Sequence, residues 1–406
     1  MKTSGVMGFW KEVVAVCLAE ILGMAGFATF AALLPTFISE WHLTNTAAGW
    51  ISGIYFAGYM AAVPALVSLT DRIDPRRIYL ACTALGGISN LGYALFADGF
   101  AGALLFRALA GMSLAGTYMP GLKVLSSLVP GSIQSRVLSF YTSSFSVGAA
   151  LSFLISGQIA EWLGWRWAFG VASLGSAAAL GIAIWKIPPT KIETTFLPKT
   201  PLLDFRPVFK NATAMGYVIA YGAHTWELFG QRSWIVAFLT YSQSLQRAET
   251  GWLVPATVVA ALVNLAGVPA SIGGNELAIR FGRVRVISAI ALASATVSCM
   301  LGFLAPLSYA LVAALCLLHG VTAYGDSAAI TAGVVATASA GHQGATMAVH
   351  SFVGFACAFL APLVFGAVLD LGGGNTTAGW GFAFVSLGLA VAIGPIALAA
   401  LSRPRK

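Results

Sequence analysis

The chain has 406 residues, of which 58% are hydrophobic and only 9% are charged, and its mean hydropathy is +0.84. A soluble domain carries roughly a quarter charged residues, so this composition excludes a water-soluble globular protein. The formal net charge of +8 does not indicate nucleic-acid binding, because the basic residues follow the membrane topology derived below.

Apolar runs separated by polar residues predict the membrane-spanning helices, each of which needs about 20 residues. The first run begins near Lys11 and extends past Thr36, which is too long for the core of a signal peptide. We expect an all-α membrane protein with twelve transmembrane helices, over residues 12–38, 46–69, 77–97, 101–128, 136–160, 166–186, 212–241, 250–275, 285–305, 307–336, 345–369 and 378–401.

One long polar break divides these spans six and six. Residues 187–211 are rich in Pro, Thr and Lys, which is typical of a linker. We therefore expect an N-terminal six-helix bundle over 1–186, a cytoplasmic linker over 187–211, and a C-terminal six-helix bundle over 212–406.

The distribution of Lys and Arg orients the chain. With the N-terminus in the cytoplasm, 17 of the 22 basic residues fall in cytoplasmic segments, 2 fall outside and 3 lie within spans. Cytoplasmic loops of membrane proteins carry an excess of basic residues. We therefore expect both termini in the cytoplasm and the chain in a plasma membrane, such as the inner membrane of a bacterium.

Landmarks in the two halves repeat in the same order. Gly49-Trp50 and Gly251-Trp252 open spans 2 and 8, Gly164-Trp165 and Gly379-Trp380 open spans 6 and 12, and a basic loop follows both span 2 and span 8. The offsets of 202 to 215 residues indicate duplication of a six-span unit. A duplicated half with a binding site between the copies is a recognised transporter architecture.

With twelve spans, internal termini, a long central loop and basic loops after spans 2 and 8, the chain resembles the major facilitator superfamily. The family signature after span 2 is Gly-x-x-x-Asp-Arg-x-Gly-Arg-Arg. Asp71, Arg72 and Arg76 match it, and Arg77 follows directly, whereas Val67 replaces the first Gly and Asp74-Pro75 replaces Gly-Arg. The resemblance implies two pseudo-symmetric six-helix bundles and transport by alternating access.

The same resemblance extends to spans 4 and 5. The span-4 signature, Arg followed four residues later by Gly, is matched by Arg107 and Gly111. The span-5 signature of many drug antiporters contains a Gly-Pro pair, but span 5 here has Gly148 and no proline. Proton-driven efflux of amphiphilic drugs or other toxic compounds is therefore the alternative function rather than the leading one.

Ionisable residues inside spans are costly and mark substrate or proton paths. Except for His350 in span 11, those of this chain lie in spans 1, 4, 7 and 10, which line the central cavity in the superfamily. They are Glu20, Arg107, Lys123, His224, Glu227, Arg232, His319 and Asp326. On an ideal helix Lys123 lies about 160° from Arg107, so only one of the two faces the cavity unless Pro120 bends span 4.

These residues define the candidate site. On helical spacing His319, Thr322 and Asp326 lie on or near one face of span 10, and Tyr221, His224 and Glu227 are neighbours on span 7. We predict a substrate-binding set of Arg107, Tyr118, Tyr221, His224, Glu227, His319 and Thr322. For proton coupling we predict Glu20, Glu227 and Asp326, since carboxylates in a dry cavity can load and release protons near neutral pH.

A cytoplasmic gate is implied by the family resemblance. Asp71 ends span 2 and is expected to dock against the N-terminus of span 11, where free N–H groups and the helix dipole favour a carboxylate. Arg72, Arg76 and Arg77 are expected to hold the loop beside it. The second copy of the motif has Ile279 at the acidic position, so no equal contact is expected there.

The leading hypothesis is a secondary transporter, a proton-coupled symporter or antiporter of a small polar or charged organic solute. We expect protons, this solute and the lipid bilayer as its partners, a monomer, and no nucleic acid. His224-x-x-Glu227 has helical metal-ligand spacing, but no third ligand lies nearby in sequence, so we expect neither metal nor cofactor. A metalloprotease His-Glu-x-x-His motif and a nucleophile elbow are both missing from the sequence, so we expect no enzyme. A receptor or channel is a further alternative, but the six-plus-six repeat is better explained by two rocking halves.

Overall fold

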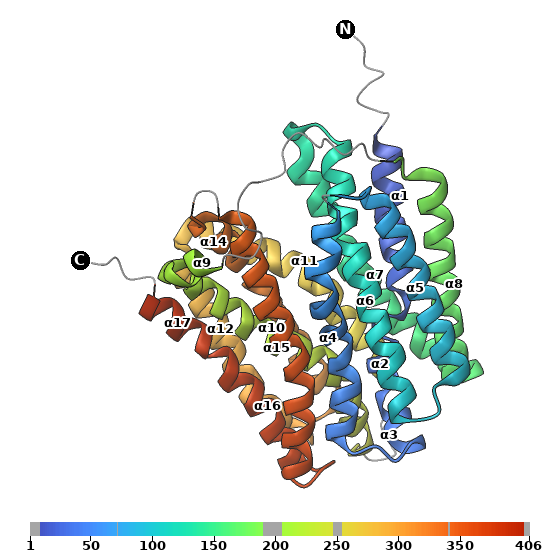
Figure 1. Ribbon diagram of the computed structural model, residues 1–406. Coiled ribbons are helices and arrows are strands. Elements are labelled where there is room, and N and C mark those ends of the chain that lie inside the picture. The colour runs from blue at the N-terminus through green and yellow to red at the C-terminus, as the bar shows by residue number, and fades with distance from the viewer. Residues whose placement is uncertain (1–8, 71, 190–204, 247–253, 340–341, 402–406) are drawn as a thin grey trace. The chain divides into compact units, whose positions relative to one another are not determined.

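The computed structural model describes residues 9–70, 72–189, 205–246, 254–339 and 342–401 (Figure 1). Within these residues every regular element is a helix. The chain forms two compact units, one made of Met1–Leu33 and Ala57–Lys199, the other of Leu34–Phe56 and Thr200–Lys406. The end of the first expected span and the first half of the second thus group with the C-terminal residues.

The first unit contains the long helices of spans 3 to 6 and the first part of span 1. Its elements are α1 (Trp10–Gly23), η1 (Met24–Gly26), α2 (Thr29–Ala32), α5 (Pro75–Phe96), α6 (Phe100–Leu128), α7 (Gly131–Leu163) and α8 (Trp165–Lys186). Helix α4 (Asn45–Leu69) belongs to this unit from Ala57 onward.

The second unit holds the remaining spans. Its elements are α3 (Leu34–Glu40), the first part of α4, α9 (Arg206–Lys210), α10 (Ala212–Ser244), α11 (Ala256–Phe281), α12 (Arg283–Leu301), η3 (Gly302–Leu304), α13 (Tyr309–Gly325), α14 (Ser327–Thr337), α15 (Gln343–Leu371), α16 (Thr377–Val391) and α17 (Ile393–Leu401). Helix α10 is buried along most of its length and packs against α13 to α17.

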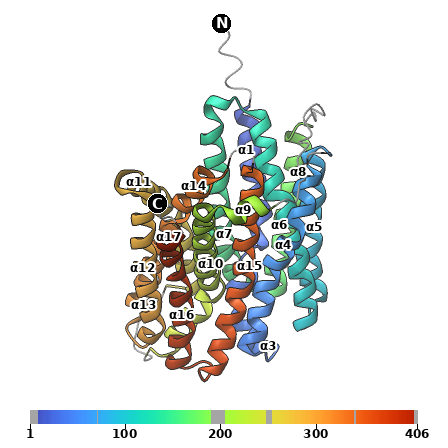
Figure 2. The ribbon, with the colours of Figure 1, turned by 60° about the vertical axis from the view of Figure 1, so that its left-hand side comes forward.

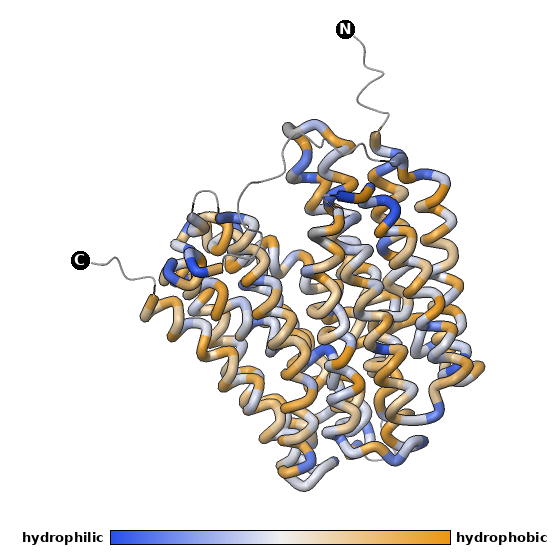
Figure 3. The backbone as a smooth tube through the Cα atoms, viewed as in Figure 1, coloured by the Kyte–Doolittle hydropathy of each residue, from blue (hydrophilic) through white to orange (hydrophobic). Residues whose placement is uncertain are grey.

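Ten of the described helical segments are long and apolar enough to cross a membrane. The two remaining expected spans are a first span divided into α1, η1, α2 and α3, and α10, which has 33 residues but carries His224, Glu227 and Arg232. Large apolar side chains are exposed on the helices, such as Trp185 (85%) and Leu389 (65%), and Figure 3 shows hydrophilic residues mainly near helix ends and turns. Surfaces of this kind require lipid, which confirms an all-helical membrane protein.

The basic loop after span 2 shows how the sequence starts a helix. Asp74 is the N-cap of α5, and its carboxylate accepts a hydrogen bond from the Arg76 backbone N–H at 3.0 Å. Pro75 occupies the first helical position, where no N–H is needed and its fixed φ suits the helix. Asp74-Pro75 therefore supplies the turn that the Gly-Arg of the family signature would make.

Two expected spans are interrupted in the middle. In span 1 the α-helix stops at Gly23 and resumes as short segments, and in span 10 α13 ends at Gly325 and α14 begins at Ser327, with Asp326 between them. Figure 2 labels α13 and α14, the two parts of span 10. Irregular backbone inside a bilayer is tolerated only where it is buried in protein or lines a cavity. Such breaks point to binding sites in transporters.

A close helix crossing holds the break in span 10. A Cβ added at Gly274 of α11 would overlap the carbonyl oxygen of Gly325, whereas one at Gly273 would meet no atom within 4 Å. Because a backbone carbonyl cannot rotate away, Gly274→Ala should destabilise the protein by about 1–3 kcal/mol or more. Gly273→Ala, the matched control, should be neutral or stabilising by about 1 kcal/mol through helix propensity. Melting temperatures of the two purified variants test this, and equal values would contradict it.

Candidate functional site

Two histidine–carboxylate pairs connect α10 to span 10. His224 Nδ1 lies 2.8 Å from Asp326 Oδ1, and His319 Nε2 lies 2.9 Å from Glu227 Oε1. All four residues are at most 3% exposed. Each helix gives one imidazole and one carboxylate, so the arrangement is reciprocal. A buried charge is tolerated when it is paired in this way.

A chain of hydroxyl groups extends the Glu227 pair. The Ser294 hydroxyl of α12 donates to Glu227 Oε1 at 2.9 Å, and the Thr322 hydroxyl lies 2.9 Å from the Ser294 oxygen. Glu227 Oε1 therefore faces two donors, one from Ser294 and one from the imidazole of His319. Among the described residues no hydrogen bond reaches His319 Nδ1. If Glu227 is ionised, the His319 ring donates from Nε2, and Nδ1 is then an acceptor in the neutral ring and a second donor in the imidazolium.

Aromatic stacking surrounds the other pair. The Tyr221 ring lies parallel to the His350 ring at 3.7 Å, and its centroid is 5.9 Å from that of His224. His350, on α15, is 3% exposed. The predicted neighbours Tyr221 and His224 are thus in one buried cluster with a residue of span 11.

A buried cation lies farther along α10. The Arg232 guanidinium lies 4.9 Å from the Phe229 ring centroid and 5.7 Å from that of Tyr324, within the range of cation–π attraction. It also donates to the Tyr324 hydroxyl, which in turn lies 2.8 Å from Asn264 Oδ1. This polar group joins α10, α11 and α13.

Asp326 lies at the helix break in span 10. Asp326 ends α13 and starts α14, its backbone is in the right-handed helical region (φ −93°, ψ −10°), and its side chain makes no capping hydrogen bond to α14. Its Oδ1 instead lies 2.8 Å from His224 Nδ1. The contact with His224 is therefore the interaction that stabilises this carboxylate among the described residues.

The third predicted acid lies in the first unit. Glu20 of α1 is 2% exposed, and the Tyr141 hydroxyl of α7 donates to its Oε2 at 2.9 Å. Within the described residues no hydrogen bond reaches Glu20 Oε1. Tyr118, a predicted substrate contact, stacks on Tyr141 with ring centroids 5.6 Å apart. Glu20 and Tyr118 are thus joined through one tyrosine.

The two basic residues of span 4 take separate partners. Arg107 donates to the Phe27 carbonyl at 3.3 Å, in the interrupted part of span 1, and its guanidinium lies over the Phe30 ring. Lys123 donates to the Thr70 carbonyl at 2.9 Å. Arg107 therefore supplies a hydrogen-bond donor to a backbone carbonyl in the part of span 1 where the regular helix is interrupted.

Of the predicted gate residues, Asp71 lies outside the described part of the chain. Arg72 and Arg77 are exposed, whereas Arg76 is half-buried and donates to the Ile184 carbonyl at 2.7 Å. Arg76 thus connects the start of α5 to the end of α8.

Sequence reasoning missed the partners contributed by other helices. Ser294, Tyr141 and Asn264 lie in spans 9, 5 and 8 and carry no charge, so no cost of burial singled them out. The stacking of His350 on Tyr221 was also missed. Helical spacing relates residues of one helix only, so it could not have found any of these contacts.

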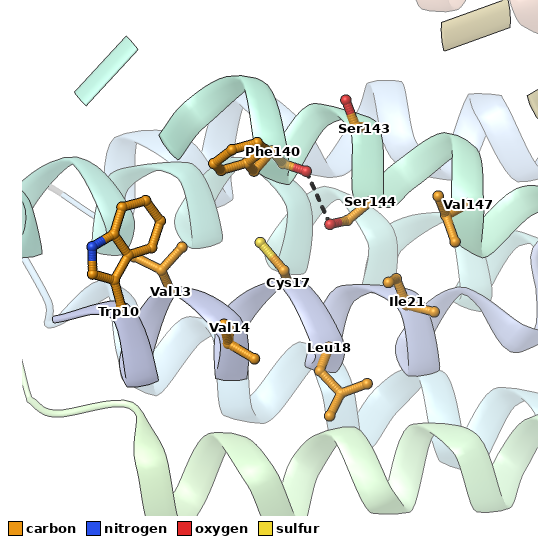
Figure 4. Close-up of a pocket in the computed structure, with 10 residues that line it drawn as sticks. All are labelled: Trp10, Val13, Val14, Cys17, Leu18, Ile21, Phe140, Ser143, Ser144 and Val147. Carbon is orange, nitrogen blue, oxygen red and sulfur yellow. Dashed lines mark hydrogen bonds between the residues drawn. The ribbon is translucent and has the colours of Figure 1, made fainter. Parts of the chain in front are cut away.

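A separate groove lies between α1 and α7 (Figure 4). Its volume is about 520 Å³, and its walls are apolar apart from two serines and Cys17. The Ser144 hydroxyl donates to the Phe140 carbonyl at 3.0 Å rather than into the groove. The lining residues are Trp10, Val13, Val14, Cys17, Leu18, Ile21, Phe140, Ser143, Ser144 and Val147. None of the predicted site residues is among them, so the polar site and this groove are distinct.

The fold and the buried ionisable residues are those of a transporter, and comparison with known families gives the same result. Residues 16–241, more than half of the chain, match the family model of the Major Facilitator Superfamily. The chain belongs to the major facilitator superfamily. It is a secondary transporter and not an enzyme.

Relatives within the superfamily are distant. The inner membrane transport protein YnfM of Escherichia coli is 31% identical over 45% of this chain and 45% of its own length. The uncharacterised transporter YycB of Bacillus subtilis is 24% identical over 90% of this chain and 88% of its own length. The niacin transporter NiaP of Acinetobacter baylyi is 25% identical over 39% of this chain and 36% of its own length. The chain thus matches about half of YnfM.

Solved structures show the same fold. The nucleoside transporter NupG superposes with a TM-score of 0.75 at 13% identity, covering 97% of this chain and all of NupG. A bacterial homologue of the lysosomal transporter Spinster gives 0.73 at 16% identity, covering 96% of this chain and 94% of its own. At these identities the likeness concerns the fold alone, and it confirms the predicted major facilitator fold.

Proposed function

We propose that this transporter moves a small polar or charged organic solute by alternating access and couples the movement to protons. The observation that carries the proposal is the reciprocal pairing of Glu227 with His319 and of Asp326 with His224 beside a broken span. A carboxylate and an imidazole in contact can exchange a proton, and its presence or absence changes the charge of the pair. The state of these pairs would then depend on both the proton and the solute.

The solute site would be formed by polar groups from both halves. From the C-terminal half we propose Tyr221, His224, Glu227, His319 and Thr322, and from the N-terminal half Arg107 and Tyr118. Glu20 is the proton-coupling candidate of the N-terminal half, because it is buried and has one carboxylate oxygen without a partner among the described residues.

The organisation proposed for the chain is that of two six-helix halves, over 1–186 and 212–406, with the linker 187–211 and both termini in the cytoplasm. We propose a monomer in a bacterial inner membrane, where the relative YnfM is found according to its name. Reporter fusions after Trp162 and Gln243 should report the outside, and fusions after Pro75 and Lys199 the inside. A C-terminus outside the cell would contradict this topology.

The experiment begins with the solute. A melting-temperature screen of the purified protein against nucleosides, niacin and small organic acids should find a ligand that raises the melting temperature, because binding to the folded state stabilises it. The ligand is then followed into liposomes that contain the protein, with and without an imposed pH gradient. Accumulation that requires the gradient is expected.

The three acids are then compared as amides: Glu20→Gln, Glu227→Gln and Asp326→Asn. At least one amide variant should lose accumulation against a gradient and still exchange solute across the membrane, since an amide cannot release a proton. If all three variants accumulate the solute at normal rates, coupling through these acids is wrong.

A further inference from the structure

Asp370, at the C-terminal end of α15, binds the N-terminus of α4 through four hydrogen bonds. Its Oδ1 accepts from the Asn45 backbone N–H at 3.1 Å and from the Asn45 side-chain amide at 2.8 Å. Its Oδ2 accepts from the Thr46 N–H at 2.8 Å and from the Thr46 hydroxyl at 2.6 Å. Both ends of this contact lie in the same compact unit, which contains Leu34–Phe56 as well as α15.

The chemistry of this contact is favourable for physical reasons that do not depend on a ligand. The first N–H groups of a helix have no partner within it, and the helix dipole places partial positive charge there. A carboxylate satisfies both needs at once, and hydrogen bonds to an ionised acceptor are about twice as strong as neutral ones. Asp370 is half-buried, so water screens the contact only in part.

Below this contact the two helices touch through glycines. A Cβ at Gly49 or Gly53 of α4 would overlap the carbonyl oxygen of Pro362 or Phe359 on α15, and a Cβ at Gly366 would overlap the Asn45 carbonyl oxygen. Small residues at a helix interface allow this close approach. The rings of Trp50 on α4 and Phe359 on α15 also meet across this interface, with centroids 5.5 Å apart. The four hydrogen bonds of Asp370 add directional, charge-assisted contacts to this packing.

We propose that Asp370 is a latch residue that holds the start of span 2 against the end of span 11, on the side of the bilayer opposite the termini, and that the latch opens and closes during transport. This inference rests on the alternating-access function proposed above, but it does not depend on the nature of the solute or the coupling ion. The sequence places Asp71 at the other end of span 2, so each end of this helix would have an acid of its own.

The test is a distance measurement on the full-length purified protein, without solute. Spin labels are placed at Ser39 on α3 and at Leu371, which are both exposed, in a variant whose five cysteines are replaced. In the parent protein a short distance between the labels is expected. Asp370→Asn keeps the shape of the side chain but removes its negative charge. In either orientation of the amide, an NH₂ group also replaces one of the two acceptor oxygens. The substitution should raise the population at long distance about tenfold or more, the equivalent of about 1.4 kcal/mol.

Thr44→Ala is the matched control. The Thr44 hydroxyl accepts from the Ala47 N–H at 3.1 Å, at the same helix end but without contact to α15. Its loss should leave the distances unchanged. The latch is wrong if Asp370→Asn has the distance distribution of the parent, or if Thr44→Ala shifts it equally. Because no solute is present, neither outcome depends on whether proton coupling is correct.

Discussion

Glu227→Gln is expected to abolish proton-driven accumulation of the solute, lowering the rate of gradient-driven uptake by about 100-fold or more, the order by which one positioned proton-transfer group changes a rate. The amide oxygen can still accept from the Ser294 hydroxyl and the His319 ring, which lie 2.9 Å from Glu227 Oε1. The variant should therefore fold and still exchange solute. What it loses is the ability to take up and release a proton.

Ser294→Ala provides the matched control for this prediction. It removes one hydrogen bond from Glu227 and keeps the carboxylate and the His319 contact. A hydrogen bond to a charged group contributes about 1.5–3 kcal/mol, so accumulation should be weakened and not lost. Rates of uptake into liposomes with an imposed pH gradient, and of exchange without one, distinguish the two variants. Equal losses in both would mean that Glu227 acts through structure alone.

His224→Ala is expected to destabilise the protein by about 3–5 kcal/mol, because it leaves the Asp326 carboxylate buried without its partner. Asp326→Ala should be harmful for the converse reason. In the double variant no charge is left unpaired, so its loss of stability should be smaller than the sum of the single losses by about 0.5–3 kcal/mol. Unfolding of the purified proteins by SDS in mixed micelles measures the loss of stability of each single variant and of the double variant.

His350→Ala serves as a control for the loss of a buried ring of the same kind. His350 stacks on Tyr221, and no ion pair joins it to an acid among the residues that the structure describes. In the double variant of His350→Ala and Asp326→Ala, the loss of stability should be close to the sum of the two single losses. It should be closer to that sum than in the double variant of His224→Ala and Asp326→Ala. Full additivity for His224 and Asp326 would show that their contact contributes nothing to stability.

The fold could be predicted from the sequence because lipid imposes a strong and simple constraint. Each crossing needs a long apolar run, and apolar runs of this length are visible without any knowledge of packing. The basic residues after span 2 and at the C-terminus then orient the runs. The signatures around Asp71 and Arg107 indicated the family. The match of residues 16–241 to the family model confirmed it.

The interruptions of spans 1 and 10 could not be predicted from hydropathy. Residues 24–33 are as apolar as a continuous helix, and the break at Asp326 depends on the partner that satisfies it. Ala28 N–H donates to the Ser152 hydroxyl at 2.9 Å, and the Phe27 carbonyl accepts from Arg107. Both partners come from other helices, so only the folded chain reveals why the backbone can leave the helix there.

The candidate site was predictable in its residue types and not in its pairing. Charges in spans are rare enough to single out His224, Glu227, His319 and Asp326 from the sequence alone. Spacing along one helix suggested that His224 and Glu227 are neighbours. It could not show that each pairs with a residue of span 10, because the register between the two helices is set by packing, such as that of Tyr217 on α10 against Gly333 on α14.

The central claim is that solute movement and proton movement are coupled, and the pH outside liposomes tests it most directly. A solute that raises the melting temperature is added to weakly buffered liposomes containing the protein, and the external pH is recorded. In the parent protein a change of pH on solute addition is expected, which a protonophore abolishes and which Glu227→Gln does not show. Solute entry in the parent protein with no accompanying change of pH would contradict this coupling.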